Sequence, residues 1–294
     1  MIITKLIGGL GNQMFQYAAG RSLAMRHGVP LLLDITELRS YPKHQGYQFE
    51  DVFAGRFEIA GLIPLIRVLG RKARKVPKTV AVVSPKWPPM GDHVWVRQRT
   101  HDYDAAFESI GADCYLSGFW QSEKYFATIA PQIRESFRFK EALTGANAAI
   151  ASRMKEAPSA AIHIRRGDYV TDKGAHAFHG LCAWDYYDAA IDHISRHEPD
   201  ARFFVFSDDV VAAQERFANR QRAEVVAVNS GRHSYRDMML MAQCKHQIIA
   251  NSTFSWWAAW LNQNPDKIVV APGTWFSGND GQIKDIYCKD WIVI

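Results

Sequence analysis

The chain has 294 residues, enough for two domains of about 150 residues each with a sizeable core. Its hydrophobic residues make up 48% and its charged residues 22%, which is typical of a globular protein, and no run of about 18 apolar residues predicts a membrane-spanning helix. The net charge of +5 at pH 7 favours anionic partners such as nucleotide phosphates, acidic lipids or nucleic acid.

The N-terminal half opens with a strand–helix–strand pattern. Residues 1–8 predict a strand, residues 12–27 a helix that stops at Gly28, and residues 30–35 a second buried strand. Residues 36–110 show no clear periodicity, and the segment 67–78 within them carries six basic residues. Residues 114–120 predict another strand, after which Ser122 is placed to cap a helix that continues to about Phe137.

The C-terminal half alternates regularly between strands and helices. Strands are predicted at 159–164, 201–206, 224–228, 246–250 and 267–271, and helices at 184–197, 208–220, 234–244 and 253–262. This alternation predicts a parallel sheet with helices on both faces. The pattern changes near 145–157, which predicts two domains, 1–150 and 151–294.

The cysteines and the N-terminus bear on the compartment. The four cysteines are far apart and form no CxxC pair, which argues against structural zinc and favours reduced thiols. The first residues lack the pattern of a signal peptide, because Lys5, Asn12 and Gln13 interrupt the apolar run. The sequence therefore predicts a cytoplasmic protein.

Polar residues follow several predicted strands, where ligands bind in open parallel sheets. They lie in four loops: 8–13 (GGLGNQ), 165–168 (RRGD), 207–209 (SDD) and 251–255 (NSTFS). In the second loop, Arg165 and Arg166 can offer planar guanidinium groups to phosphate oxygens, and a surface pair with Asp168 is the alternative. In the fourth loop, Ser252 and Thr253 start a helix and either form an anion site or simply cap it.

The glycine-rich turn is also compatible with a dinucleotide-binding enzyme. Gly9, Gly11 and Asp34 partly match a nicotinamide-dinucleotide site, although Met14 stands where a third glycine is required. Asn12 and Gln13 can bond a sugar hydroxyl, but Gln13 fits an exposed first-turn helix position equally well. A nicotinamide-dependent oxidoreductase is therefore one alternative, and a non-enzymatic polyanion-binding protein, suggested by the net charge and by 67–78, is another.

The acidic residues allow a metal without requiring one. Asp208 and Asp209 follow a strand and are equally suited to capping the next helix, and Asp237 could hold a ribose, a base or a helix start. No HExxH or other compact cluster of metal ligands is present. Because two arginines could neutralise a diphosphate, we expect no metal and no other cofactor.

Four motifs resemble those of the α-1,2-fucosyltransferases that use GDP-L-fucose: GGLGNQMFQYA, HIRRGDYV, FSDD and NSTFSWWAAWL. They run from residue 8 to residue 261, and the HIRRGD stretch is the most specific of them. The resemblance implies an α/β fold of GT-B type, in which two Rossmann-like domains face each other across a cleft. It further implies that the C-terminal half binds GDP-fucose and that the N-terminal half binds much of a galactose-terminated glycan acceptor, with no nucleic-acid partner.

The resemblance also assigns residue roles. Arg166 is expected to contact the diphosphate. His163 and Arg165 are expected to hold that loop in place or to contact the donor. Asn12 is expected to face fucose or phosphate, and Asp237 to contact the guanosine. Ser252, Thr253 and Ser255 are expected to form the anion site at the helix start. Transfer from a β-linked donor to an α-linked product inverts configuration, so a general base should assist the attacking hydroxyl.

The base is expected just beyond the arginine loop, where Asp172 and His179 lie. Asp168 is nearer, but pairing with an arginine would keep its pKa low and make it a poor base. The basic segment 67–78 is interpreted as a solvated loop, with peripheral docking to anionic membrane as the alternative.

Overall fold

The computed structural model describes residues 1–39, 44–70, 95–167, 180–276 and 284–294, and the chain divides into two compact units. The first unit comprises Met1–Lys140 and Lys284–Ile286, and the second comprises Glu141–Ile283 and Tyr287–Ile294. The boundary at 150 expected from the sequence falls inside helix α5 (Gly145–Arg153), which belongs to the second unit.

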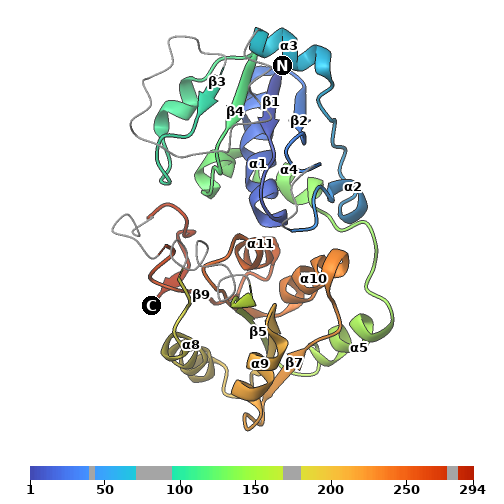
Figure 1. Ribbon diagram of the computed structural model, residues 1–294. Coiled ribbons are helices and arrows are strands. Elements are labelled where there is room, and N and C mark those ends of the chain that lie inside the picture. Colours follow the sequence, from blue (N-terminus) through green and yellow to red (C-terminus); the bar gives the residue numbers. More distant parts are fainter. Residues whose placement is uncertain (40–43, 71–94, 168–179, 277–283) are drawn as a thin grey trace. The chain divides into compact units, whose positions relative to one another are not determined.

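The first unit is built on a parallel sheet in the order β2-β1-β4-β3, with α1 packed against β1 (Figure 1). The strands are β1 (Ile2–Lys5), β2 (Leu31–Asp34), β3 (Trp95–Arg97) and β4 (Cys114–Ser117). The α-helices are α1 (Leu10–His27), α2 (Phe49–Val52), α3 (Leu62–Leu69) and α4 (Ala130–Ser136), and short 3-10 turns are η2 (Ala105–Ser109), η3 (Glu123–Tyr125) and η4 (Ala127–Ile129).

Local chemistry sets the ends of these elements. Helix α1 stops at Gly28, whose φ of 62° lies in the left-handed region that glycine adopts readily. The single helix expected over 122–137 is wrong: Ser122 caps η3 instead, and α4 begins only near Pro131. Pro131 lies in the first turn of α4, where its missing N–H costs nothing, whereas inside one continuous helix it would remove a backbone hydrogen bond.

The second unit has a parallel sheet in the order β10-β9-β8-β5-β6-β7. Its strands are β5 (Ser159–Ile164), β6 (Arg202–Ser207), β7 (Ala223–Val226), β8 (His246–Ile248), β9 (Val269–Ala271) and β10 (Ile292–Val293). Its other elements are α5, α8 (Trp184–His197), α9 (Val210–Phe217), η5 (Gly231–His233), α10 (Tyr235–Gln243) and α11 (Thr253–Leu261).

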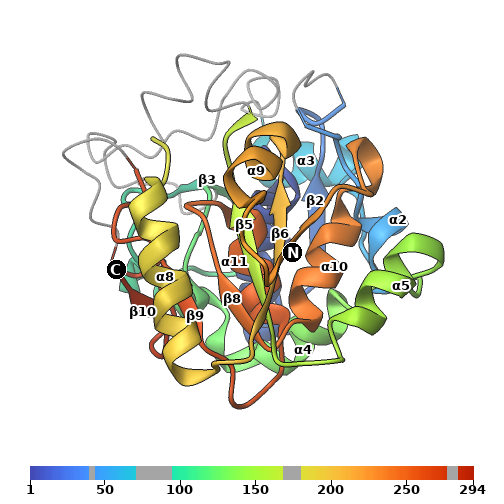
Figure 2. The same cartoon turned by 90° about the horizontal axis from the view of Figure 1, so that it is seen from below.

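Helices cover both faces of this second sheet, with α8 and α10 on opposite sides (Figure 2). Every residue of β5 is buried, as expected for the central strand of a parallel sheet. Ala160, Ile162 and Ile164 pack with residues of α8 and α9 in one apolar cluster. Each unit thus has the Rossmann-like build that a GT-B-like protein requires, which confirms the predicted α/β fold class.

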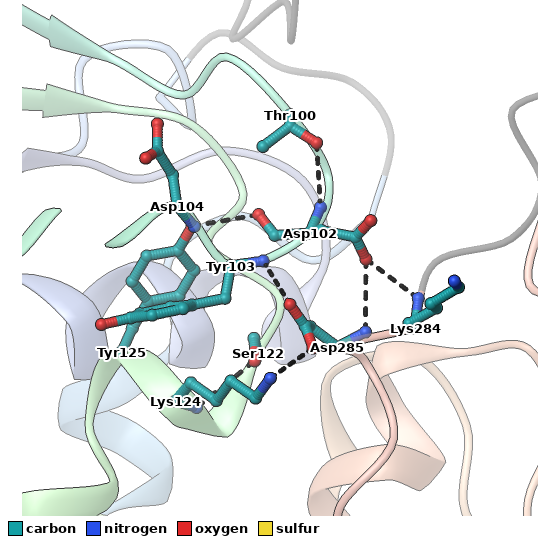
Figure 3. Close-up of polar contacts among 9 residues, drawn as sticks. All are labelled: Thr100, Asp102, Tyr103, Asp104, Ser122, Lys124, Tyr125, Lys284 and Asp285. Atoms are coloured by element: carbon teal, nitrogen blue, oxygen red, sulfur yellow. Dashed lines mark hydrogen bonds and ion pairs between the residues drawn. The ribbon is translucent and has the colours of Figure 1, made fainter. Parts of the chain in front are cut away.

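Residues Lys284–Ile286 return to the first unit and are anchored there by two carboxylates (Figure 3). Asp102 Oδ1 accepts the N–H groups of Lys284 at 2.9 Å and Asp285 at 3.2 Å. Asp285 in turn accepts the N–H of Tyr103 at 3.1 Å and pairs with Lys124 Nζ at 2.5 Å. Ile286 is fully buried, so this short return is a fixed part of the first unit.

No helix in the described part of the chain has both the length and the apolar character needed to cross a membrane.

Candidate functional site

The second sheet has a topological switch point between β5 and β8. From β5 the chain moves to β6 and β7 on one side, and it then returns to add β8, β9 and β10 on the other. Ligands of open parallel sheets bind beyond the carboxyl ends of strands at such a point. Arg165–Gly167 follow β5 and Asn251–Thr253 follow β8, so two of the four polar loops expected from the sequence border this switch point.

Asp208 holds the arginine loop in place. Its Oδ2 lies 2.8 Å from Arg165 Nη1, and its Oδ1 accepts the backbone N–H of Arg166 at 2.8 Å. A Cβ on Gly167 would lie only 3.0 Å from Asp208 Oδ2, so glycine allows this close approach. Both oxygens of Asp208 therefore serve the loop, and Arg165 is already paired with a carboxylate.

Arg166 is held differently. Its guanidinium lies 5.0 Å from the ring centroid of Trp184, at the start of α8. This cation–π contact orients the side chain without neutralising its charge. Within the described residues no carboxylate pairs with the Arg166 guanidinium, which leaves it able to bind an anion.

His163 connects β5 to the start of α11 as a neutral group. Its ring centroid lies 5.7 Å from that of Phe254, and the residue is buried. Burial lowers the pKa of His163 to about 4, while Asp208 opposes the shift and Arg165 adds to it. The imidazole is therefore uncharged near neutral pH and supports the loop rather than supplying a cation.

The three hydroxyl groups predicted for an anion site at the start of α11 have different surroundings. Ser252 Oγ accepts the N–H of Phe254 at 3.4 Å, so Ser252 caps the helix. Ser255 is buried, and its hydroxyl donates to the Ser252 carbonyl at 3.2 Å. Thr253, which is only partly buried, and the free N–H groups of the first turn remain available to an anion.

Asp237 lies in the first turn of α10 within a small group of amides. Its Oδ1 accepts from Asn229 Nδ2 at 2.7 Å, and Asn229 also exchanges hydrogen bonds with Asn147. Burial raises the pKa of Asp237 to about 7, and the hydrogen bond from Asn229 opposes this shift. Asp209, in contrast, caps α9 by accepting the N–H of Ala212 at 3.1 Å.

The first sheet has its own switch point, between β1 and β4, and Asn12 lies beside it. Asn12 Oδ1 accepts from Gln121 Nε2 at 2.8 Å, which joins the first turn of α1 to the loop that follows β4. The exposed position expected as an alternative for Gln13 is wrong: Gln13 is fully buried and donates to the carbonyls of Gly8 at 2.9 Å and Gly46 at 3.0 Å, so it stabilises the turn. Sequence reasoning missed Gln121, although its place just after a predicted strand was a usable signal.

Asp34 does not have the free carboxylate that a ribose site needs. Its Oδ1 accepts from the N–H of Thr36 at 3.0 Å and from its hydroxyl at 2.5 Å, and its Oδ2 accepts from Tyr115 at 2.7 Å. The residue is 1% exposed. The nicotinamide-dependent alternative therefore loses the acid on which it depended.

Three expected site residues, Asp168, Asp172 and His179, lie outside the described residues. No group of three or more His, Cys, Asp or Glu side chains suited to a metal ion is found where the structure describes the chain.

Comparison with known proteins identifies the family. The model of glycosyl transferase family 11 matches residues 97–294. The chain is 31% identical over 298 residues to an alpha-1,2-colitosyltransferase of Escherichia coli, covering 100% of this chain and 99% of that protein. It is also 48% identical over 126 residues to the O-antigen biosynthesis glycosyltransferase WbnK of Escherichia coli, covering 43% of this chain and 42% of that protein.

More distant similarities reach other fucosyltransferases. Galactoside alpha-(1,2)-fucosyltransferase 1 of Saimiri sciureus is 28% identical over 234 residues, covering 70% of this chain and 63% of that protein. Among solved structures, POFUT1 in complex with GDP-fucose aligns with a TM-score of 0.49 at 14% identity, covering 92% of this chain and 97% of that chain. The family match and the full-length relative show that the chain belongs to glycosyl transferase family 11.

Proposed function

We propose that this glycosyltransferase moves L-fucose from GDP-β-L-fucose to the 2-hydroxyl of a terminal galactose in an oligosaccharide or polysaccharide. The names of the relatives support the 1,2 linkage and the galactoside acceptor. The observation that carries the proposal is the state of Arg166, a stacked guanidinium without a carboxylate partner in the described residues at the β5/β8 switch point. A diphosphate is the anion that such a group and a helix start fit best.

The proposed chemistry follows from the leaving group. As the bond to fucose breaks, negative charge builds on the β-phosphate of GDP, and the Arg166 guanidinium stabilises that charge. Asp208 and Trp184 fix the loop and the guanidinium beforehand, so no large rearrangement is needed in the transition state. The galactose hydroxyl attacks from the opposite side of the sugar, passes its proton to a general base, for which we propose Asp172, and forms the inverted α-linkage as GDP leaves.

The test is transfer with two donors. Wild-type protein is incubated with GDP-fucose or with GDP-colitose, the 3-deoxy analogue, and a panel of galactosides, and the product linkage is determined by NMR. We expect α-fucose on O2 of galactose. Transfer of colitose alone would show that the donor specificity follows the Escherichia coli relative instead, and transfer of neither sugar would refute the proposal.

We also propose that the reaction needs no divalent metal. Asp208 and Asp209 are committed to the arginine loop and to the cap of α9, so neither is a free metal ligand. Activity should therefore stay within a small factor after excess chelator. Complete loss with EDTA, restored by manganese or magnesium, would contradict this.

Asp237 gives a pH-dependent prediction, since we propose that its carboxylate accepts N–H groups of guanine. The pKa of the Asp237 carboxyl is raised to about 7, so the unliganded protein holds it protonated below that pH. GDP affinity should then fall by up to about tenfold per pH unit below this value, because binding must remove the proton. Calorimetry across the range should show this slope in the wild type, and Asp237→Asn should abolish it. An unchanged slope in the variant would remove Asp237 from the guanosine site.

The same shift predicts how the stability of the unliganded protein depends on pH. A carboxyl whose folded pKa is raised contributes stability that is present at acid pH and is lost as the pH rises through about 7. In Asp237→Asn the free energy of unfolding should therefore decline less steeply as the pH rises from acid values to about 7. Denaturant titration at several pH values would measure this.

We further propose a cytoplasmic protein that contacts anionic membrane peripherally through the region of 67–78. Residues 71–78 lie outside the described residues, but α3 just before them exposes Leu62 (70%), Ile63 (80%) and Ile66 (50%) beside Arg67. Exposed apolar residues next to basic ones are typical of interfacial segments.

Vesicle binding tests this membrane proposal. Each basic residue near an anionic surface contributes about 1 kcal/mol, so neutralising Arg71, Lys72, Arg74 and Lys75 should sharply reduce binding to phosphatidylglycerol vesicles. Activity on a soluble acceptor should not change. Equal vesicle binding by both forms would leave 67–78 as a solvated loop.

A further inference from the structure

Two amide side chains meet across the switch point of the first sheet. Asn12 lies in the first turn of α1, just after β1, and Gln121 follows β4; these strands are parallel neighbours, so the two segments leave the sheet side by side. Gln121 Nε2 donates to Asn12 Oδ1 at 2.8 Å. Gln121 is 7% exposed, whereas Asn12 is only partly buried. A ligand can therefore reach the Asn12 side chain but not the Gln121 side chain.

The backbone that carries Gln121 is held in a conformation that few residues adopt. Trp120 has a φ of 54°, in the left-handed region, which is rare for a bulky residue. Its buried ring packs against Phe107, with ring centroids 5.5 Å apart, and against Tyr125 at 5.3 Å. Such conformations persist only where the surrounding structure enforces them, and they cluster at functional sites.

Gln98 supplies the second constraint on this loop. Its side-chain Oε1 accepts the N–H groups of Phe119 at 2.7 Å and Trp120 at 2.9 Å, and the residue is buried. A Cβ on Gly118 would lie 2.4 Å from Gln98 Cβ, so only glycine lets the loop approach so closely. These contacts fix the backbone that leads to Gln121, while its amide bonds Asn12 through Nε2 and its buried Oε1 has no hydrogen-bond partner among the described residues.

The hydrogen bond from Gln121 determines what Asn12 presents to a ligand. Asn12 Oδ1 is occupied as an acceptor, and no partner of Asn12 Nδ2 exists among the residues that the structure describes. Nδ2 lies over Gly8, where an added Cβ would be only 2.7 Å away, so this glycine leaves the space that the amide occupies. Asn12 thus faces outward as a hydrogen-bond donor.

We propose that Gln121 is a positioning residue that locks the Asn12 amide with its NH2 group toward substrate, where it binds an oxygen that can only accept a hydrogen bond. This class comprises phosphate, ring and glycosidic oxygens. A hydroxyl oxygen can also accept from the NH2 group, but because it can donate as well it would not require a fixed orientation of the amide. The proposal rests on the proposed function only in that substrate binds beside this switch point.

Gln121→Glu tests the lock through pH. While the introduced carboxyl is protonated it can donate to Asn12 Oδ1, as the glutamine does. Once ionised it can only accept, so it draws Asn12 Nδ2 toward itself and presents Oδ1 to substrate. Burial at this position raises the pKa of the introduced carboxyl, which moves this transition toward the pH range of the assay.

We expect the kcat/KM of Gln121→Glu, divided by that of the wild type at each pH, to be near one at acid pH and to fall at least about tenfold as the pH rises. Gln132→Glu, which adds a carboxyl at an exposed position of α4, should show no such fall. Gln121→Met, which keeps the volume without the hydrogen bond, should be impaired equally at every pH. Effects on the KM for donor or for acceptor then show which substrate carries the oxygen.

A ratio for Gln121→Glu that does not change with pH, or one that rises with pH, would overturn the proposal. A ratio that rises with pH would mean that the Gln121 and Asn12 amide groups have the opposite orientation, so that Asn12 presents its oxygen to substrate. The side-chain NH2 resonance of Asn12 in 15N NMR spectra, assigned by its loss in Asn12→Asp, gives a readout independent of activity. It should shift with pH in Gln121→Glu and not in the wild type, even if fucose transfer itself is not observed, so failure of the lock and failure of the proposed function are distinguishable.

Discussion

Replacing Arg166 by alanine should lower kcat by about 100- to 1000-fold, the loss that follows removal of one preorganised charge-stabilising group. GDP binding should weaken by roughly tenfold or more, because a charge-assisted contact to phosphate is lost. The protein should still fold, since the guanidinium makes a stacking contact and not a buried ion pair in the described residues. Steady-state kinetics, calorimetry with GDP and a thermal melt would measure these three quantities.

Two further variants make this test specific. Arg166→Lys should also fail, because an ammonium group reproduces neither the planar donor geometry nor the stack on Trp184. Arg202→Ala is the matched control: it removes the same charge from the same sheet, at the start of β6, where Arg202 pairs with Glu156 at 2.7 Å. A lysine variant with near-normal activity, or an equal loss in the control, would contradict the role of Arg166.

Asp172→Asn should cut transfer by roughly two to four orders of magnitude if Asp172 is the general base that we propose. Affinity for GDP should change little, and slow hydrolysis of GDP-fucose by water should suffer less than transfer to galactose. Asp172 lies outside the described residues, so this assignment rests on its place in the sequence just after the loop that Asp208 holds.

The control for this prediction is internal to the enzyme. Hydrolysis and transfer are measured in the same preparation, so a folding defect would lower both alike. An Asn variant that keeps more than about a tenth of wild-type transfer would exclude Asp172, because general-base catalysis contributes more than that. His179 would then be the next residue to replace.

The second unit was the more predictable half of the chain. Its central strands are buried on both faces and therefore appear as short apolar runs, such as the one at 159–164. The loops at 165–168 and 251–255 could be assigned to one rim because parallel strands end at a common edge, and the observed order places β5 and β8 side by side. β10 was not predicted, since Ile292–Val293 is too short for a pattern.

Contacts between distant residues could not be predicted. The pairing of an arginine with Asp168 lies outside the described residues, and the sequence did not suggest the observed pair of Arg165 with Asp208, which is close only because β5 and β6 are neighbours. The anchoring of Asp285 by Tyr103 and Lys124 spans an even longer stretch of chain. The position of Gln121 after a predicted strand was visible in the sequence, but its hydrogen bond to Asn12 was not, because it depends on β4 lying next to β1.

Local sequence patterns could not decide between two plausible roles of the same side chain. Ser252 caps α11 and Gln13 braces the glycine-rich turn, so both side chains already have bonds within the protein. The segment 36–110 was hard to predict because the elements in its described part are short: α3 has eight residues and β3 has three. Sequence periodicity needs longer elements than these to be recognised.

The most direct measurement of the central claim is a crystal structure of the protein with GDP. We predict the β-phosphate at the β5/β8 switch point, within hydrogen-bonding distance of the Arg166 guanidinium and near the first turn of α11 around Thr253. Finding the diphosphate instead on the glycine-rich turn of residues 8–13, with Arg166 still stacked on Trp184 and touching no phosphate, would contradict the account.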